Sequence, residues 1–371
     1  MRDRARIGVF VSSGLVPAER HETVSGHVRI ALKTAELLSG AGHDVTVFTT
    51  GAGTLPVERN GLNVVALPTH SRDYWDLDAS QAAKQFARMA AHLQRGGYRM
   101  FHTFGAGRVG YQAALLRAMG VVPRCVVSVT VPDDQRLQRR LARFALAQAD
   151  AVIAMTATSA ALLDGLGARH VCLARPGVTK DLRGGRRLFP GRTVLYWRYG
   201  SPFDGGDLTL AAFHVLAPRF PAVHFVFAVA DWSPLLGEMQ ALAAQHANVH
   251  VLTAPYNGLG TRDLLASADI CVLPFRQASL HPQLTLLECL NTSTPVVTTT
   301  VGSNAEVLGQ GSAGILLDRP EAAAIVDAVA ALLDDEPRRA ALAQGAAVAA
   351  RLWNWDDYRT ALLELYRELL A

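Results

Sequence analysis

Cysteine is scarce in this sequence and forms no recognisable pattern. The 371 residues include four cysteines, at positions 125, 172, 271 and 289. No two of them stand at the short spacing that structural zinc sites use, and each lies in an apolar stretch. We therefore expect reduced core residues of a cytoplasmic protein and no metal site.

Long hydrophobic runs are also missing. No stretch of 18 consecutive apolar residues occurs, and the first residues, MRDRARIGVFVSS, turn polar after one short apolar run. We therefore expect neither a membrane-spanning helix nor a signal peptide. One segment, QRLQRRLARFALAQA, places Arg136, Arg139, Arg140 and Arg143 on one side of a predicted helix. Such a face can touch an anionic membrane, but most faces of this kind are simply solvated, so membrane contact is not favoured.

Two phosphate-binding fingerprints are not found where they would be expected. The loop after the first strand-like segment lacks the G-x-G-x-x-G spacing, which gives a nicotinamide or flavin enzyme little support. The G-x-x-x-x-G-K-[ST] loop of nucleoside triphosphatases is absent.

Charge is sparse and nearly balanced. Charged residues make up 18% of the chain, half of the residues are hydrophobic, and the net charge is +4. This composition indicates a compact globular protein and gives no sign of nucleic-acid binding, although the field slightly favours anions such as phosphates. The length suggests two domains.

Strand-like and helix-like segments alternate along both halves of the chain. This rhythm predicts an α/β protein in which each half holds a parallel sheet covered by helices on both faces. Pro, Gly and Arg cluster near residues 178–190, which is typical of a connection between domains. The expected strands are 6–11, 45–48, 62–68, 98–104, 124–131 and 149–155 in the first half, and 193–197, 223–229, 249–254, 269–275, 294–299 and 314–318 in the second.

We expect three parts in this chain. Residues 1–178 form a first Rossmann-like domain, residues 187–355 form a second, and residues 356–371 form a final helix. That helix carries apolar residues at helical spacing, so it must pack on another element. The residues concerned are Tyr358, Leu362, Leu365, Tyr366 and Leu369.

Gly26 is a first candidate for ligand binding. It stands between the first predicted strand and the first predicted helix, next to His27. A glycine there lets a substrate phosphate or sugar approach the backbone, but it can equally serve only to permit the turn.

The stretch LHPQLTLLE, residues 280–288, is a second candidate. Pro282 is suited to the first turn of a helix, so Gln283, Leu284 and Thr285 would offer N-terminal N–H groups to an anion. Glu288 follows inside an apolar pattern, where an ionised side chain needs a partner or a ligand. We expect it to accept hydrogen bonds from a ribose beside that anion, or to be paired structurally.

The region around this stretch has a recognisable series of residues. Residues 266–308 contain Ala268-Asp269, Pro274, Glu288, Pro295-Val296-Val297, Gly302 and Glu306 in order. The series resembles the donor-nucleotide segment of family-4 glycosyltransferases of the GT-B fold. The segments GHDVTVFTT, FHTF, ADAVIAM and ARPGV are similar to other parts of that family.

The resemblance implies a fold and a reaction. Two doubly wound parallel-sheet domains would face each other across a cleft, and the last helix would cross back to the first domain. The enzyme would transfer a sugar from a UDP- or GDP-linked donor to a small-molecule, glycan or lipid-linked acceptor, with retention of configuration and without cofactor or metal. The alanine- and arginine-rich composition hints at a GC-rich bacterial genome.

The residue patterns and the resemblance together give a set of expected site residues. Arg198, His281 and His102 are the expected catalytic residues. Arg198 and Gly205, together with residues 282–285 and Glu288, would bind the donor. Gly26, His27 and His102 would bind the acceptor.

Three positions depart from the family pattern. Leu280 replaces the first of two paired glutamates, Gly205 replaces the diphosphate lysine, and Thr130 replaces a histidine of the first domain. His281 is expected to compensate for the missing charge. The departures keep two alternatives open, a nucleotide-sugar epimerase or hydrolase of the same fold and a non-catalytic partner subunit.

Overall fold

The computed structural model describes most of the chain. The described residues are 4–12, 26–51, 61–69, 77–105, 108–128, 136–182, 184–254, 260–279 and 281–371. They divide into two compact units, of which unit 1 is Met1–Thr179 with Trp355–Ala371, and unit 2 is Lys180–Asn354.

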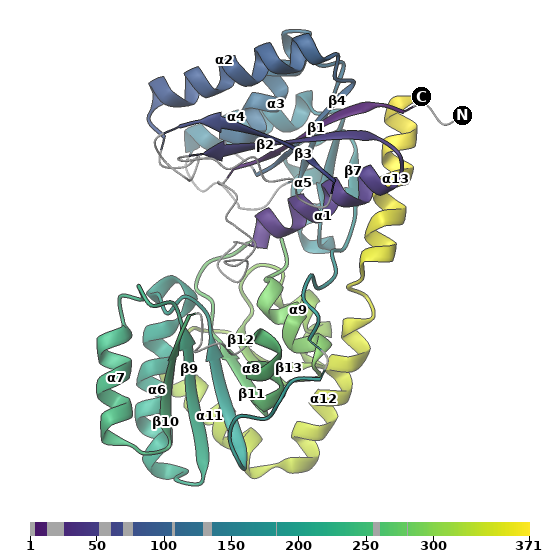
Figure 1. Ribbon diagram of the computed structural model, residues 1–371. Coiled ribbons are helices and arrows are strands. Elements are labelled where there is room, and N and C mark those ends of the chain that lie inside the picture. Colours follow the sequence, from purple (N-terminus) through teal and green to yellow (C-terminus); the bar gives the residue numbers. More distant parts are fainter. Residues whose placement is uncertain are drawn as a thin grey trace. The chain divides into compact units, whose positions relative to one another are not determined.

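Unit 1 contains a seven-stranded sheet whose order is β3-β2-β1-β4-β5-β6-β7 (Figure 1). All neighbouring strands are parallel. Because such strands are covered on both faces, they are apolar along their length, and every residue of β4 is buried. The strands are β1 Arg6–Val11, β2 Asp44–Gly51, β3 Asn63–Pro68, β4 Met100–Phe104, β5 Arg124–Ser128, β6 Ala151–Ala154 and β7 Val171–Leu173.

Helices cover both faces of this sheet. In Figure 1, α2, α3 and α4 lie on one face and α1 and α13 lie on the other. Local sequence sets their ends: Asp78 accepts the Gln81 N–H at the start of α2, and Gly97 ends that helix in the left-handed conformation. The helices are α1 Gly26–Gly40, α2 Ala79–Gly96, α3 Arg108–Ala118, α4 Arg136–Gln148, α5 Ala157–Gly165 and α13 Trp355–Leu370.

The last helix of the chain, α13, packs within unit 1 against α1 and β7. The indole N–H of Trp355, the first residue of this helix, donates to the Val178 carbonyl at 3.0 Å. The hydroxyls of Tyr358 and Thr34 form a buried hydrogen bond of 2.7 Å. The apolar face predicted for this helix is therefore buried, with Tyr358, Leu362, Leu365 and Tyr366 inside.

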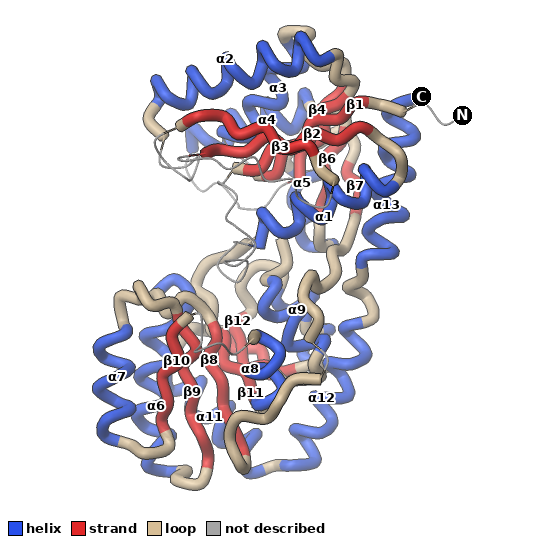
Figure 2. The backbone as a smooth tube through the Cα atoms, viewed as in Figure 1, coloured by secondary structure: helices blue, strands red, loops and turns tan. Residues whose placement is uncertain are grey.

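Unit 2 contains a six-stranded parallel sheet with the order β10-β9-β8-β11-β12-β13 (Figure 2). The order reverses between β8 and β11, and ligands of such sheets bind beyond the strand ends at that point. The strands are β8 Arg192–Trp197, β9 Val223–Val229, β10 Val249–Thr253, β11 Ile270–Leu273, β12 Val296–Thr299 and β13 Gly314–Leu317.

The core of unit 2 lies between its sheet and three of its helices. Phe213 of α6, Met239 of α7 and Ile325 of α11 pack with Phe225 and Phe227 of β9. The other face carries α8, α9 and α12 (Figure 2). The helices are α6 Gly206–Arg219, α7 Leu236–Gln245, α8 Thr261–Ser267, α9 Leu284–Asn291, α10 Asn304–Val307, α11 Ala322–Asp334 and α12 Glu336–Ala350.

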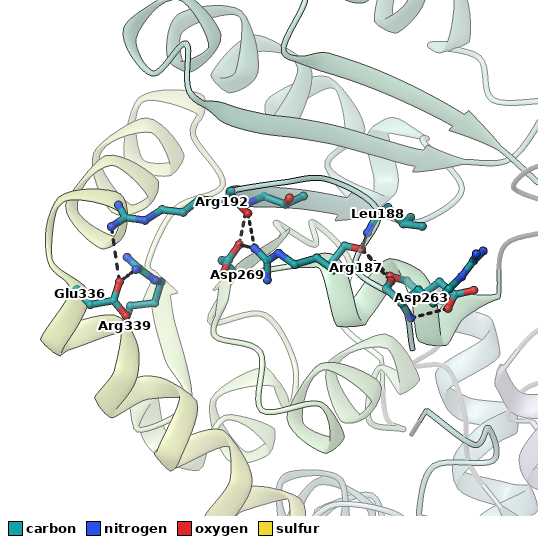
Figure 3. Close-up of polar contacts among 11 residues, drawn as sticks. Arg187, Leu188, Arg192, Asp263, Asp269, Glu336 and Arg339 are labelled. Atoms are coloured by element: carbon teal, nitrogen blue, oxygen red, sulfur yellow. Dashed lines mark hydrogen bonds and ion pairs between the residues drawn. The ribbon is translucent and has the colours of Figure 1, made fainter. Parts of the chain in front are cut away.

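The segment before β8 is fastened to unit 2 by polar contacts (Figure 3). The Leu188 N–H donates to Ser267 Oγ at 2.8 Å, and Arg187 pairs with Asp269. Arg192 contacts Glu336 at 3.6 Å, and Glu336 also pairs with Arg339. The later part of the expected connection, which contains Arg187 and Leu188, is therefore bound to unit 2.

The α/β class and the two doubly wound parallel sheets are confirmed. All six strands expected in the second half are present. The first half has one strand more than expected: β7, at the sheet edge, lies between the last expected strand and the expected connection. None of the described helices is long and apolar enough to cross a membrane.

Candidate functional site

The best-defined polar site of unit 2 lies where β8 and β11 end. Arg198 follows β8 directly and is held on several sides. Its Nε donates to Asp204 Oδ1 at 3.0 Å, and its Nη2 donates to Gln283 Oε1 at 3.4 Å. The guanidinium carbon lies 5.1 Å from the ring centroid of Tyr199 and 5.3 Å from that of Phe275. Arg198 is thus fixed at the start of α9.

The loop after Arg198 requires a glycine. Gly205 has a φ of 74°, which favours glycine. A Cβ atom at this position would lie 2.2 Å from the Pro274 carbonyl oxygen of the β11 loop. Gly205 thus brings the two loops together. Its neighbour Asp204 is only 8% exposed and accepts from Ser201 Oγ at 2.6 Å as well as from Arg198.

The start of α9 differs by two residues from the prediction. The helix begins at Leu284 with Gln283 as its N-cap, so Pro282 lies before the helix rather than in its first turn. The N–H groups available to an anion are those of the first turn, which includes Leu284 and Thr285. Thr285 is 8% exposed, and its buried Oγ1 has no hydrogen-bond partner among the described residues.

The surroundings of His281 disfavour the positive charge expected of it. Burial lowers its pKa, and the nearby charge of Arg198 lowers it further. Its Nδ1 lies 2.9 Å from the Pro282 carbonyl oxygen. The lowered pKa disfavours the charged form that would replace a lysine ammonium, and the compensating role of His281 stays a prediction.

Glu288 has a structural partner that sequence reasoning missed. The residue is 3% exposed, and its Oε1 lies 3.3 Å from Lys180 Nζ. The same ammonium donates to Thr261 Oγ1 at 2.8 Å and lies 5.0 Å from the ring centroid of Trp197. In the sequence, the one feature that could have drawn attention to this partner is that Lys180 is the only lysine of unit 2.

The predicted residues of unit 1 fall into two groups. Gly26 is the first residue of α1 and is partly exposed, and His27 Nε2 lies 3.3 Å from Ser12 Oγ at the end of β1. Gly26 and His27 lie together beyond the carboxyl end of β1, where a ligand could approach. Their role in acceptor binding stays a prediction.

His102 is a core residue. It is fully buried, its Nδ1 lies 2.8 Å from Tyr366 Oη, and its Nε2 lies 2.8 Å from Ser128 Oγ. Burial lowers its pKa to about 3. With both ring nitrogens engaged, His102 has no atom left for a substrate, so the structure contradicts its predicted catalytic and acceptor-binding roles.

Some predicted positions lie outside the described residues. Leu280 and Thr130 are among them. Of the basic segment, Arg140 and Arg143 are exposed. Within the described part of the chain, no three His, Cys, Asp or Glu side chains are grouped so that they could hold a metal ion.

Family models match both units of the chain. Residues 191–335 match the model described as glycosyl transferases group 1. Residues 25–177 match the glycosyl transferase 4-like domain. The chain is a glycosyltransferase.

Relatives that align with nearly the whole chain are also named as glycosyltransferases. A D-inositol 3-phosphate glycosyltransferase of Xylanimonas cellulosilytica is 28% identical over 91% of this chain and 90% of its own. That of Acidothermus cellulolyticus is 27% identical over 91% of this chain and 84% of its own. The similarity therefore covers both units of this glycosyltransferase.

Solved structures show the same fold. Sucrose-phosphate synthase from Thermosynechococcus elongatus matches with a TM-score of 0.80 at 17% identity, covering 99% of both chains. Anabaena HepE in complex with UDP-glucose matches with a TM-score of 0.72 at 16% identity, covering 98% of this chain and 99% of HepE. These neighbours confirm the expected GT-B fold.

Proposed function

We propose that this enzyme transfers a sugar from a nucleoside-diphosphate sugar to an acceptor, with retention of configuration at the transferred carbon. The donor would bind to unit 2 beyond the ends of β8 and β11. The observation that carries the proposal is the position of Arg198, whose guanidinium group is held at the first turn of α9.

This arrangement is suited to a diphosphate. The N–H groups of a first helical turn and the helix dipole favour an anion, and a guanidinium group beside them adds charge-assisted hydrogen bonds. Thr285 Oγ1 adds a hydroxyl at the same helix start that has no partner among the described residues. Glu288, one turn further along α9, would accept hydrogen bonds from the ribose hydroxyls.

The reaction needs few protein groups. As the bond between the sugar and the diphosphate breaks, charge develops on the leaving diphosphate, and Arg198 and the α9 N–H groups would stabilise it. The acceptor hydroxyl would form the new bond on the same face and give its proton to the leaving diphosphate. The enzyme then contributes mainly orientation and electrostatic stabilisation, and no buried histidine acts as base.

The named relatives guide the choice of substrates. HepE was solved with UDP-glucose, which supports a UDP-linked donor over a GDP-linked one. The relatives named for D-inositol 3-phosphate support a phosphorylated small molecule over a glycan or a lipid-linked acceptor.

The test begins with donor binding. A thermal-shift panel of UDP-, GDP-, ADP- and TDP-sugars should give a rise in Tm for one nucleotide class, because a ligand that binds only the folded state stabilises it by mass action. The selected donor is then incubated with acceptors, and the anomeric configuration of the product is determined by NMR. Inversion of configuration would refute the proposed stereochemistry.

Arg198→Ala supplies the decisive comparison. Loss of a charge-assisted contact to the leaving group should lower kcat by about 100- to 1,000-fold. Arg338→Ala, at an exposed position of α12, serves as the matched control and should retain full activity. Sugar release or epimerisation without an acceptor would favour a hydrolase or epimerase. Donor binding with no turnover under any condition would favour a non-catalytic subunit.

A further inference from the structure

Lys180 occupies a central place beside the proposed ribose carboxylate. It is the first residue of unit 2, and its ammonium group contacts residues of three separate elements. These are Trp197 at the end of β8, Thr261 at the start of α8 and Glu288 in α9. The donor site as described so far gives Lys180 no role.

The geometry limits how the Glu288 carboxylate can turn. A carboxylate has two oxygens and turns about its last bond unless something holds it. Lys180 Nζ contacts Oε1 at 3.3 Å, and Thr261 Oγ1 fixes the same ammonium at 2.8 Å. The indole face of Trp197 attracts the cation from another direction. The ammonium is thus fixed by groups other than the carboxylate.

The pair is also chemically matched. Glu288 is almost entirely buried, and a buried carboxylate is costly without a counter-charge. A lysine ammonium is a compact charge with three donors, so it can serve the carboxylate and Thr261 together. An ionised, oriented carboxylate is the form that accepts hydrogen bonds from two neighbouring hydroxyls.

We propose that Lys180 is a positioning residue for donor selection: it holds one oxygen of the Glu288 carboxylate so that the group is directed at the ribose diol of a nucleoside diphosphate. This inference rests on the proposed function, because it assumes that Glu288 meets the ribose. It predicts that Lys180 determines the preference for ribose hydroxyls rather than the affinity for phosphate.

The experiment compares two ligands on the intact chain. UDP and 2′,3′-dideoxy-UDP differ only in the diol, so the ratio of their Kd values, measured by calorimetry, reports the hydroxyl contacts alone. The wild-type enzyme should prefer UDP by about 10- to 100-fold, the effect of hydrogen bonds to a charged group. If GDP is the better ligand, the guanosine pair replaces the uridine pair.

Lys180→Met should bring this ratio close to one while the dideoxy nucleotide binds as before. Thr261→Val, which removes one contact of the ammonium, should lower the ratio partly and serves if Lys180→Met does not fold. Lys180→Arg keeps the charge and should retain part of the ratio. Lys33→Met is the matched control, because Lys33 pairs with Glu36 on the surface of α1, and it should leave the ratio unchanged.

The outcomes separate the two claims. An unchanged ratio in Lys180→Met, with Glu288→Ala abolishing it, overturns the role of Lys180 and leaves the proposed function intact. An equal loss of affinity for UDP and dideoxy-UDP shows that Lys180 acts on the phosphates or the fold, and this also overturns its positioning role. A wild-type protein that binds no nucleoside diphosphate overturns both.

Discussion

Arg198 and Asp204 form an ion pair in which Arg198 Nε donates to Asp204 Oδ1 at 3.0 Å. Asp204 is itself held by the hydroxyl of Ser201 at 2.6 Å. The aspartate thus occupies the inner nitrogen of the guanidinium group, and the outer nitrogen Nη2 faces Gln283 at the start of α9. In the proposed mechanism, the guanidinium group that meets the diphosphate is therefore oriented by a carboxylate of its own loop.

Asp204→Ala should therefore impair transfer even though Asp204 itself meets no substrate in the proposed mechanism. We expect kcat/KM to fall by about 10-fold or more, because an unanchored guanidinium group loses its orientation. Steady-state kinetics on the best donor measure the effect. Asp207→Asn is the control, since Asp207 pairs with Arg276 in a more exposed position. Equal kinetics for wild type and Asp204→Ala would show that Arg198 needs no such support.

Gly205→Ala should destabilise unit 2. The added Cβ would clash with the Pro274 carbonyl oxygen, and the positive φ adds strain, so we expect a loss of about 1–3 kcal/mol in the free energy of unfolding. Gly237→Ala in α7 is the control, because an added Cβ there meets nothing within 4 Å. Thermal unfolding of both variants measures the difference. A Gly205→Ala protein as stable as wild type would contradict the close approach of the two loops.

Tyr366→Phe should weaken unit 1 without affecting nucleotide binding. Loss of the hydroxyl leaves the buried Nδ1 of His102 without its partner, which costs about 1–3 kcal/mol. Thermal unfolding should show a lower Tm, while calorimetry should give the wild-type Kd for the donor nucleotide. A changed Kd with an unchanged Tm would return His102 to the functional residues.

The buried His102 also predicts a pH dependence of stability. Its pKa is about 3 in the folded chain, against an ordinary value of 6.5. Between these values the unfolded chain binds a proton that the folded chain excludes. The contribution of His102 is therefore fully present above pH 6.5 and decreases as the pH falls towards 3, by up to about 1.4 kcal/mol per pH unit.

The measurement is the difference between wild type and His102→Gln. Unfolding is followed from pH 7 to pH 5, and the variant should lose stability less steeply than wild type over this range. Taking the difference cancels the contributions of the other histidines. Parallel curves for the two proteins would show that His102 is not excluded from protonation in the folded state.

The sequence predicted the sheets better than the side-chain partners. Alternating apolar strands and helices have a local period, so each of the six strands of unit 2 could be found from its own residues. The edge strand β7 has only three residues, none of them fully buried, and it carried too little apolar signal beside a Pro- and Gly-rich stretch.

The partners of the charged and polar residues depend on distant parts of the chain. Tyr366 lies 264 positions after His102. Lys180 and Glu288 come from segments separated by four strands along the chain, β8 to β11. No local pattern encodes such pairs, so the burial of Glu288 was predictable and the identity of its counter-charge was not.

Because α13 belongs to unit 1, the two units are completed in a fixed order during synthesis. Ribosomes synthesise a chain from its N-terminus, and domains generally fold as units as they emerge. Unit 2 is continuous from Lys180 to Asn354, so it is complete before Trp355 is added. Until the final residues appear, His102 lacks Tyr366 and Thr34 lacks Tyr358. The first residues to be synthesised thus belong to the last domain to be finished.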